Sequence, residues 1–185
     1  MLQQRDFTFI YRYFMAEKQE SLLFLVIGIV AVLLGISFIF FFKNNPSLFK
    51  GMAIPLIAIG LVQIIVGYTV YSRTDKQKTD VAYQAGTDLG FVRSVEIPRM
   101  EKVMKNFAIY RYTEIGLAIL GIALFVYFRN DPEKILWKGI GITLAIQAII
   151  MLAADGFAEK RGAEYKEELQ NFIGATSESS YKNSN

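Results

Sequence analysis

Residues 42–46 read Phe-Lys-Asn-Asn-Pro, and residues 128–132, 86 positions later, read Phe-Arg-Asn-Asp-Pro. Each copy lies between two long apolar segments and is soon followed by Lys-Gly, at residues 50–51 and 138–139. Asn and Asp favour turns, and Pro cannot donate a backbone hydrogen bond but suits the start of a new helix. Each motif therefore predicts a tight turn between two antiparallel helices, and its repetition predicts two copies of one helical hairpin.

The apolar segments of the first copy have the length of membrane spans. Residues 21–42 give 22 residues without a charge, and residues 51–71 give 21. At 1.5 Å per residue such helices would be about 31–33 Å long, whereas a hydrocarbon core is about 30 Å thick. Both segments are therefore expected to cross a membrane. Small residues four positions apart predict close helix contacts in lipid, and such pairs are Ala31/Gly35 here and Gly141/Ala145 in the second copy.

The second copy is less uniform. Residues 115–128 are too short to span, so this helix must extend back to Phe107. Residues 135–154 have the right length and carry one charge, Lys138, near the end of the segment, from which it can reach the interface. The sequence thus predicts an all-α protein, an integral membrane four-helix bundle made of two tandem transmembrane hairpins that share one orientation.

Basic residues predict how the chain lies in the membrane. With four spans, 14 Lys and Arg residues fall on one side, within residues 1–20, 72–106 and 155–185, and 5 fall around the two hairpin turns. Cytoplasmic segments of membrane proteins carry an excess of Lys and Arg. We therefore expect a multi-pass protein of the bacterial inner (plasma) membrane with both termini in the cytoplasm.

The same boundaries divide the chain into five segments. We expect an N-terminal interfacial segment, a first transmembrane hairpin, a cytoplasmic loop with an amphipathic helix, a second hairpin, and a helical extension that ends in a disordered tail from Gly174. The segments cover residues 1–20, 21–71, 72–106, 107–154 and 155–185. Within the loop, the polar run from Thr79 to Ser94 contains Gly86 and Gly90 and predicts a break between two helical pieces. Asp155, at the end of the fourth span, is expected in the cytoplasmic membrane interface.

The composition excludes several kinds of chemistry. The chain has no Cys and no His, so it cannot form a disulfide, a Cys/His zinc site, a Ser-His-Asp triad or a Cys nucleophile. No motif for a cofactor is present, and we expect neither a cofactor nor enzymatic activity. The net charge of +3 comes from basic residues interleaved with acidic ones, which is not typical of nucleic-acid binding.

Four polar residues in the spans are candidates for function. They are Arg111, Glu114, Gln63 and Gln147. Glu114 would lie about 10 Å deep if its helix begins at Phe107, and Arg111, three residues earlier, is its natural partner. Glu114 is either part of an ion- or proton-coupled site or half of a pair with Arg111 that caps a short helix, and we favour the pair. For Gln63 and Gln147 we favour hydrogen bonds between helices over substrate binding.

An amphipathic pattern before the third span is a candidate interaction face. Apolar residues recur at helical spacing between Met100 and Phe107, and Pro98 suits the start of the helix. Basic residues alternate with them, so we expect this helix to lie in the membrane interface. The candidate face comprises Arg99, Met100, Lys102, Val103 and Lys105.

These features favour an interaction protein that has no chemistry of its own. One version is an immunity protein that neutralises a toxin attacking the bacterial membrane. The alternative is a small transporter or channel subunit that works as an oligomer and lines a polar cavity with Glu114, Gln63 or Gln147. The expected partners are the lipid bilayer, another protein and, for the alternative, further copies of the chain.

Overall fold

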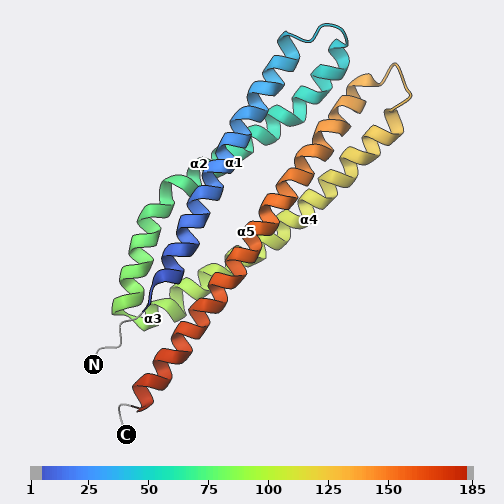
Figure 1. The fold of residues 1–185 in the computed structure, drawn as a ribbon. Helices are drawn as coiled ribbons and strands as arrows, with labels where there is room; N and C mark the ends of the chain where they lie inside the picture. Colours follow the sequence, from blue (N-terminus) through green and yellow to red (C-terminus); the bar gives the residue numbers. More distant parts are fainter. Residues whose placement is uncertain (1–5, 183–185) are drawn as a thin grey trace.

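A computed structural model of the chain describes residues 6–182, and throughout this range the regular structure is helical, with no strand. Four helices are each long and apolar enough to cross a membrane, which confirms the predicted all-α class (Figure 1). These are α1 (Thr8–Phe40), α2 (Pro46–Thr87), α4 (Ile97–Phe128) and α5 (Ile135–Lys182), and two short elements, α3 (Leu89–Phe91) and η1 (Val92–Glu96), lie between α2 and α4.

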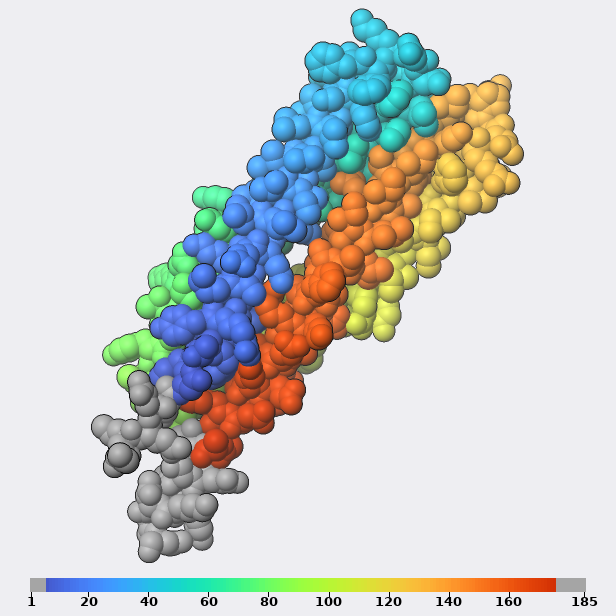
Figure 2. Space-filling model, viewed as in Figure 1, coloured from blue at the N-terminus to red at the C-terminus, as the bar shows by residue number. Residues whose placement is uncertain are grey.

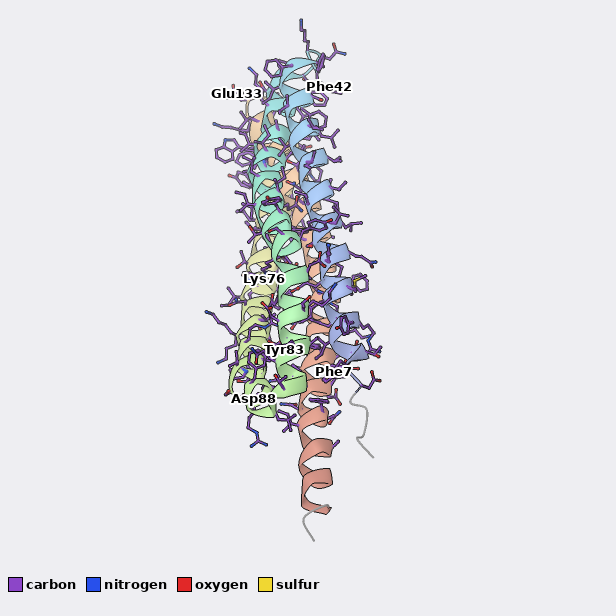
Figure 3. The ribbon with its side chains drawn as sticks, turned by 90° about the vertical axis from the view of Figure 1, so that its left-hand side faces the viewer. Phe7, Phe42, Lys76, Tyr83, Asp88 and Glu133 are labelled. Atoms are coloured by element: carbon purple, nitrogen blue, oxygen red, sulfur yellow. The ribbon has the colours of Figure 1, made fainter. Side chains whose placement is uncertain are left out.

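Both predicted turns close antiparallel helix pairs at the same end of the molecule (Figures 1 and 3). The first turn, residues 41–45, ends where Pro46 opens α2, a position at which the missing N–H of proline costs nothing. The second turn, residues 129–134, is longer, and Asp131 Oδ1 accepts a hydrogen bond of 2.9 Å from the backbone N–H of Glu133. The paired helices are α1 with α2 and α4 with α5, and α2 with α5 joins the two hairpins.

We call residues 21–71 and 107–154 the apolar half of the molecule. Its apolar side chains point mostly outward, since only 17% of the most apolar window of α1 is buried. Outward-facing apolar side chains suit helices that are surrounded by lipid. Midway along the molecule a small opening is visible between α1 and α5 (Figure 2).

Glycines let the helices of the first hairpin approach closely. A Cβ atom at Gly28 would lie 2.7 Å from the backbone oxygen of Gly60, and one at Gly35 would lie 2.7 Å from the side chain of Ile57. Ala31, the other small residue predicted at this contact, faces Gly60. In lipid, where helices gain little from burying apolar surface, such close backbone packing is a main source of association.

The second hairpin uses the same device in the register that the small residues predicted. A Cβ atom at Gly121 would lie 2.5 Å from the backbone nitrogen of Ala145 and 2.9 Å from the backbone oxygen of Gly141. The two hairpins then meet through Gly51 on α2 and Gly139 on α5. The oxygen of Leu136 would lie 2.1 Å from a Cβ atom at Gly51, which leaves no room for a side chain there.

We call residues 6–20, 72–106 and 155–182 the polar half of the molecule. Most of residues 72–106, predicted to form a loop with one helix, are helical, because α2 continues to Thr87 and the chain resumes a helical path at Leu89. The break is at Asp88, whose Oδ1 accepts a hydrogen bond of 2.7 Å from the N–H of Gly90. The predicted break between Thr79 and Ser94 therefore occurs, but it is very short.

The polar half has a core of its own, to which every long helix contributes. This cluster of buried residues comprises Ile10, Tyr13, Phe14, Val81, Ala82, Ala85, Val92, Met100, Tyr165 and Leu169. The prediction of an amphipathic helix in the membrane interface is wrong, because Met100 is fully buried in this core and Val103 packs against it. The apolar stripe of α4 is covered by protein rather than by headgroups.

The ends of the chain also differ from prediction. The tail was expected to be disordered from Gly174, but α5 continues to Lys182 and projects beyond the other helices (Figures 1 and 3). The predicted N-terminal interfacial segment is largely the first turns of α1 from Thr8 onward. Residues 1–5 and 183–185, which belong to the predicted terminal segments, lie outside the described residues.

Candidate functional site

The four candidate residues of the apolar half lie at different contacts. Glu114, Gln63 and Gln147 are buried, with carboxyl or amide atoms that have no hydrogen-bond partner among the described residues. Gln63 lies against α1, where its Cβ is 2.8 Å from the position of a Cβ at Gly28. Glu114 instead faces α5, so it does not share a site with Gln63. Gln147 is buried on α5 itself.

Arg111 does not pair with Glu114 as predicted. Its Nη1 donates to both carboxylate oxygens of Glu159 on α5, each at 2.9 Å. The reason is geometric: α5 runs antiparallel to α4 and presents a carboxylate directly across from Arg111, so the long side chain reaches between helices instead of along its own. This ion pair ties α4 to α5 where the apolar half meets the polar half.

Glu114 lies one helical turn further into the apolar half, where it meets Asp155. The two carboxyl groups are within hydrogen-bonding reach of each other. Only 2% of Glu114 is exposed, and neither of its carboxylate oxygens receives a hydrogen bond from a donor in the described protein. Asp155 was expected at the membrane interface and was not a candidate, so the structure adds a second carboxyl group to the site.

A second polar cluster holds the polar half together around Glu96. Arg99 donates to this carboxylate twice, from Nε at 2.8 Å and from Nη2 at 2.7 Å, and the hydroxyl of Tyr165 donates at 2.9 Å. Glu96 is the last residue of the π-helix η1, and it is fully buried. A buried carboxylate is tolerated here because a charged partner and a hydroxyl satisfy it.

The rings of Tyr13 and Tyr165 join the two hairpins at this cluster. They are stacked with centroids 4.0 Å apart and an angle of 7° between their planes. Burial, reinforced by the charge of Glu17, raises the pKa of Tyr13 to about 12, and burial together with the Glu96 carboxylate raises the pKa of Tyr165 as well. Both tyrosines therefore stay neutral at physiological pH.

Arg99 keeps its charge in this environment. Burial by itself lowers the pKa of its guanidinium group, but the hydrogen bonds and the charge of Glu96 outweigh burial, and the pKa is raised above its ordinary value. Arg161 lies over the ring of Tyr13, 5.5 Å from its centroid, and forms an ion pair with Glu20 of α1. These contacts link α1, α4 and α5.

The predicted interaction face is divided by these contacts. Arg99 is bound to Glu96, Met100 is buried, and Val103 packs against the core, so these three residues form part of the interior of the polar half. Lys102 and Lys105 remain exposed on α4. The division follows from helical geometry. Met100 and Val103 lie on the side of α4 that packs in the core, and Lys102 and Lys105 lie on the opposite side, which faces outward.

A small cavity opens beside Tyr13 and Tyr165, between α1 and α5. Its volume is about 190 Å³, and Arg12, Arg161 and Glu168 are among the residues that line it. Pockets for small-molecule ligands usually measure about 300–1,000 Å³, so this one is small for a substrate. Among residues 6–182 no group of three or more His, Cys, Asp or Glu side chains is arranged to hold a metal ion.

Comparisons with family models, with curated proteins and with solved structures found no match to this chain. What the site can do therefore follows from its own groups. The Glu96 cluster is a structural tie, since its charges are matched and enclosed. The Glu114–Asp155 pair is different, because two acidic groups meet there without a donor from the protein.

Proposed function

We propose that this chain is a multi-pass protein of the bacterial inner membrane that acts by binding another protein and carries out no reaction of its own. The observation that carries this proposal is the construction of the polar half. All four long helices leave the apolar half and pack around one core, with Glu96, Arg99 and Tyr165 bound to one another inside it. Such a body offers its outer surface rather than an internal cavity.

The exposed lysines of α4 are the part of this surface that we assign to the partner. Lys102 and Lys105 lie on the solvent face of a helix whose opposite face is packed in the core, so their backbone is fixed while their side chains stay at the surface. Charged groups on a fixed helix face steer and orient an acidic partner. The partner surface is therefore expected to carry Asp and Glu residues.

The test is charge reversal in the full-length, affinity-tagged protein in the membranes of its own cell. We expect K102E combined with K105E to lower the amount of the co-purifying partner at least tenfold while the abundance of the protein stays unchanged. The matched control, K43E combined with K50E, reverses two exposed lysines near the first hairpin turn and is expected to retain the partner. Equal behaviour of the two double variants, or the absence of any stoichiometric partner, would contradict the proposal.

We also propose that the polar half and both termini lie in the cytoplasm. The excess of Lys and Arg in the polar half supports this orientation. Because the chain has no cysteine, a single cysteine introduced at position 43 or at position 102 would be the only thiol. In intact cells, a membrane-impermeant maleimide is expected to label the thiol at 43 and spare the one at 102. The reverse labelling pattern would invert the orientation.

We infer that the two hairpins are tandem copies of one unit. Corresponding glycine contacts in the two hairpins support this inference. Gly35 contacts Ala53 and Ile57. Gly121, which lies 86 residues after Gly35, contacts Gly141 and Ala145, which lie 88 residues after Ala53 and Ile57. The matched substitutions Gly35→Leu and Gly121→Leu are then expected to lower the thermal unfolding midpoint by similar amounts. A loss confined to one of them would argue against equivalent packing.

A transporter or channel subunit that works as an oligomer is the second candidate function. The observation that favours it is Glu114, an acidic side chain buried in the apolar half without a donor partner. Ionisable groups at such depth mark ion pathways in many membrane proteins. In vesicles that enclose a pH-sensitive dye, the protein would carry protons, and Glu114→Gln and Gln147→Ala would reduce the rate at least tenfold. Equal rates in empty vesicles would exclude this function.

A further inference from the structure

The contact between Glu114 and Asp155 brings together two carboxyl groups, of which Glu114 is buried and Asp155 half-buried. Each comes from a different helix, Glu114 from α4 and Asp155 from α5, and the two lie within hydrogen-bonding reach. Both carboxylate oxygens of Glu114 are buried and lack a donor in the described protein. A carboxyl group in such a place needs either a counter-charge or a proton.

The cation one turn away on the same helix is already paired. Arg111 lies one turn away on α4, but its Nη1 donates to both oxygens of Glu159 at 2.9 Å. Glu159, one turn beyond Asp155 on α5, adds a negative charge that acts on Asp155. The charges on the pair's own helices therefore leave the two carboxyl groups without compensation.

The other helices do not supply a counter-charge either. α1 has no charged residue within residues 21–40, and α2 has none within residues 51–71. At the edge of this region Glu20 pairs with Arg161, and Lys18 lies over the ring of Tyr71, 4.8 Å from its centroid. No Lys or Arg of the apolar part of α1 or α2 can therefore face the pair.

We propose that Glu114 and Asp155 hold one proton between them and form a proton-binding site where the apolar half meets the polar half. The proton comes from water, binds one carboxylate oxygen, and the resulting O–H donates a hydrogen bond to the other carboxylate. Two carboxylates that share a buried site cannot both remain ionised, and they take up and release this proton as a coupled unit. The proposal goes beyond the binding function above and does not depend on it.

A proton fits this site better than a metal cation. Calcium takes about six to eight oxygen ligands and magnesium about six, whereas a shared proton needs two oxygens. Among the described residues, no third Asp or Glu joins the pair to make a group that could hold a metal ion. The pairing of one carboxyl from each helix also places the proton directly at the α4–α5 contact, so its loss would force the helices to accommodate two negative charges.

The first hairpin shows what this contact is like without the acids. The offset of 86 residues that relates the two turns pairs Gly28 with Glu114, and the offset of 88 residues that follows the second turn pairs Gly67 with Asp155. A Cβ atom at Gly67 would lie 2.7 Å from the backbone nitrogen of Leu25, so at this level the first hairpin is closed by backbone packing. Carboxyl groups are therefore not required to close a hairpin of this kind.

The experiment is infrared spectroscopy of the full-length protein in lipid nanodiscs. The C=O stretch of a protonated carboxylic acid is separate from that of a carboxylate and moves in D2O. We expect about one protonated carboxyl group per chain at pH 7, lost in Glu114→Gln, in Asp155→Asn and in the double variant Glu114→Gly with Asp155→Gly. The control Glu101→Gln, at a carboxylate that is 51% exposed, is expected to keep the band.

Three results with these proteins would overturn the proposal, and a fourth applies if the variants do not fold. The first is the absence of the band in the native protein at pH 7, and the second is its survival in the glycine double variant. The third is its disappearance when Na⁺, K⁺ or Ca²⁺ is added at constant pH, which would make the pair a cation site. If the substitutions prevent folding, carboxyl-¹³C-labelled Glu or Asp in the native protein replaces them, and a band that neither label shifts contradicts the proposal.

Discussion

The two hairpins differ most at the level of Glu114. In the first hairpin the position 86 residues earlier is Gly28, where the backbone oxygen of Gly60 would lie 2.7 Å from a Cβ atom and the helices touch through their main chains. In the second hairpin the same level holds Glu114 and Asp155, whose carboxyl groups meet between α4 and α5. Both hairpins have close glycine contacts, but at this level the first has a backbone contact and the second has two carboxyl groups.

This difference separates two roles within one architecture. Close packing through glycine gives stability in lipid without any polar group, and it leaves no space for another molecule. A buried acidic pair is costly, and in membrane proteins such groups persist where they are used. On our proposal, the proton-binding pair therefore belongs to the second hairpin, and the first hairpin contributes glycine packing.

The largest effect is expected when the acidic residue found at position 114 of the second hairpin is placed at position 28 of the first. Gly28→Glu would force a side chain against the backbone of Gly60 and place an acid among apolar residues. Overpacking costs about 1–3 kcal/mol and a charge at this depth about 2.5–3.5 kcal/mol more, so we expect most of the protein to be unfolded or degraded. The measurement is the yield of monodisperse protein in detergent together with its thermal unfolding midpoint.

Two controls make this prediction specific. Gly116→Ala adds a methyl group where no atom lies within 4 Å, and it is expected to leave the midpoint unchanged or to raise it slightly. The glycine double variant of Glu114 and Asp155 makes the reverse exchange and is expected to cost about 1 kcal/mol for each glycine introduced into a helix. A stable Gly28→Glu protein would refute the view that the first hairpin is closed by backbone contact.

The second prediction concerns the cluster that joins the hairpins in the polar half. Burial raises the pKa of Tyr13 to about 12, so its folded form keeps the phenol proton at a pH where the unfolded chain has lost it. The stabilisation is fully present below about pH 10, the ordinary pKa of Tyr, and is lost as the pH rises toward 12. Its size is about 2–3 kcal/mol for a shift of two pKa units.

Spectrophotometric titration of tyrosinate measures this effect. Tyr13→Phe is expected to remove one group that titrates near pH 12 and to flatten the loss of stability above pH 10. Tyr83, which is 68% exposed, provides the matched control, and Tyr83→Phe should leave the group near pH 12 in place. A Tyr13→Phe variant that retains this late titration would show that Tyr13 is accessible to solvent.

The helices of the apolar half were predicted well from the sequence. The physical reason is that a span needs about 20 apolar residues, so its length can be read from the length of a charge-free segment. The apolar segments predicted four long helices, and the structure contains them. The small residues Ala31/Gly35 and Gly141/Ala145 predicted close helix contacts, and the structure contains these too. The turns around Pro46 and Pro132 lie between the helices of each pair. The membrane fixes the length of a span, and small residues fix where helices approach.

The polar half could not be predicted in the same way, because an apolar stripe does not state what will cover it. Met100 and Phe107 fit a helix at a lipid surface as well as one in a protein core, and only the return of α1 and α5 to the same place decides between them. The run from Thr79 to Ser94 contains Gly86 and Gly90 and suggested a longer break, but packing of Val81 and Ala85 keeps α2 helical to Thr87.

The partners of the charged residues depended on helix register, which one sequence does not give. Arg111 and Glu114 share a helix face, so a pair within α4 was expected. In the antiparallel register of α5, however, Arg111 meets Glu159 and Glu114 meets Asp155. One signal was available: the offset of 88 residues places Asp155 where the first copy has Gly67, a departure from the repeat close to Glu114.

The smallest predicted effect separates the Arg111–Glu159 ion pair from the acidic pair beside it. The two side chains are 43% and 24% exposed, so solvent screens their attraction, and a double-mutant cycle with Arg111→Ala and Glu159→Ala is expected to give a coupling of about 0.5–1 kcal/mol.

The ion pair between Lys166 and Glu101, which also joins α4 to α5, is the control. Its atoms are 3.4 Å apart and its acid is 51% exposed, so its coupling should be about 0.3 kcal/mol or less. Both couplings are measured by reversible unfolding in mixed micelles at two salt concentrations. If the Arg111 cycle gives no coupling while the Glu114 and Asp155 variants still shift the infrared band, the second hairpin is held by its acidic pair and its glycine contacts alone, and the ion pair is only a surface contact.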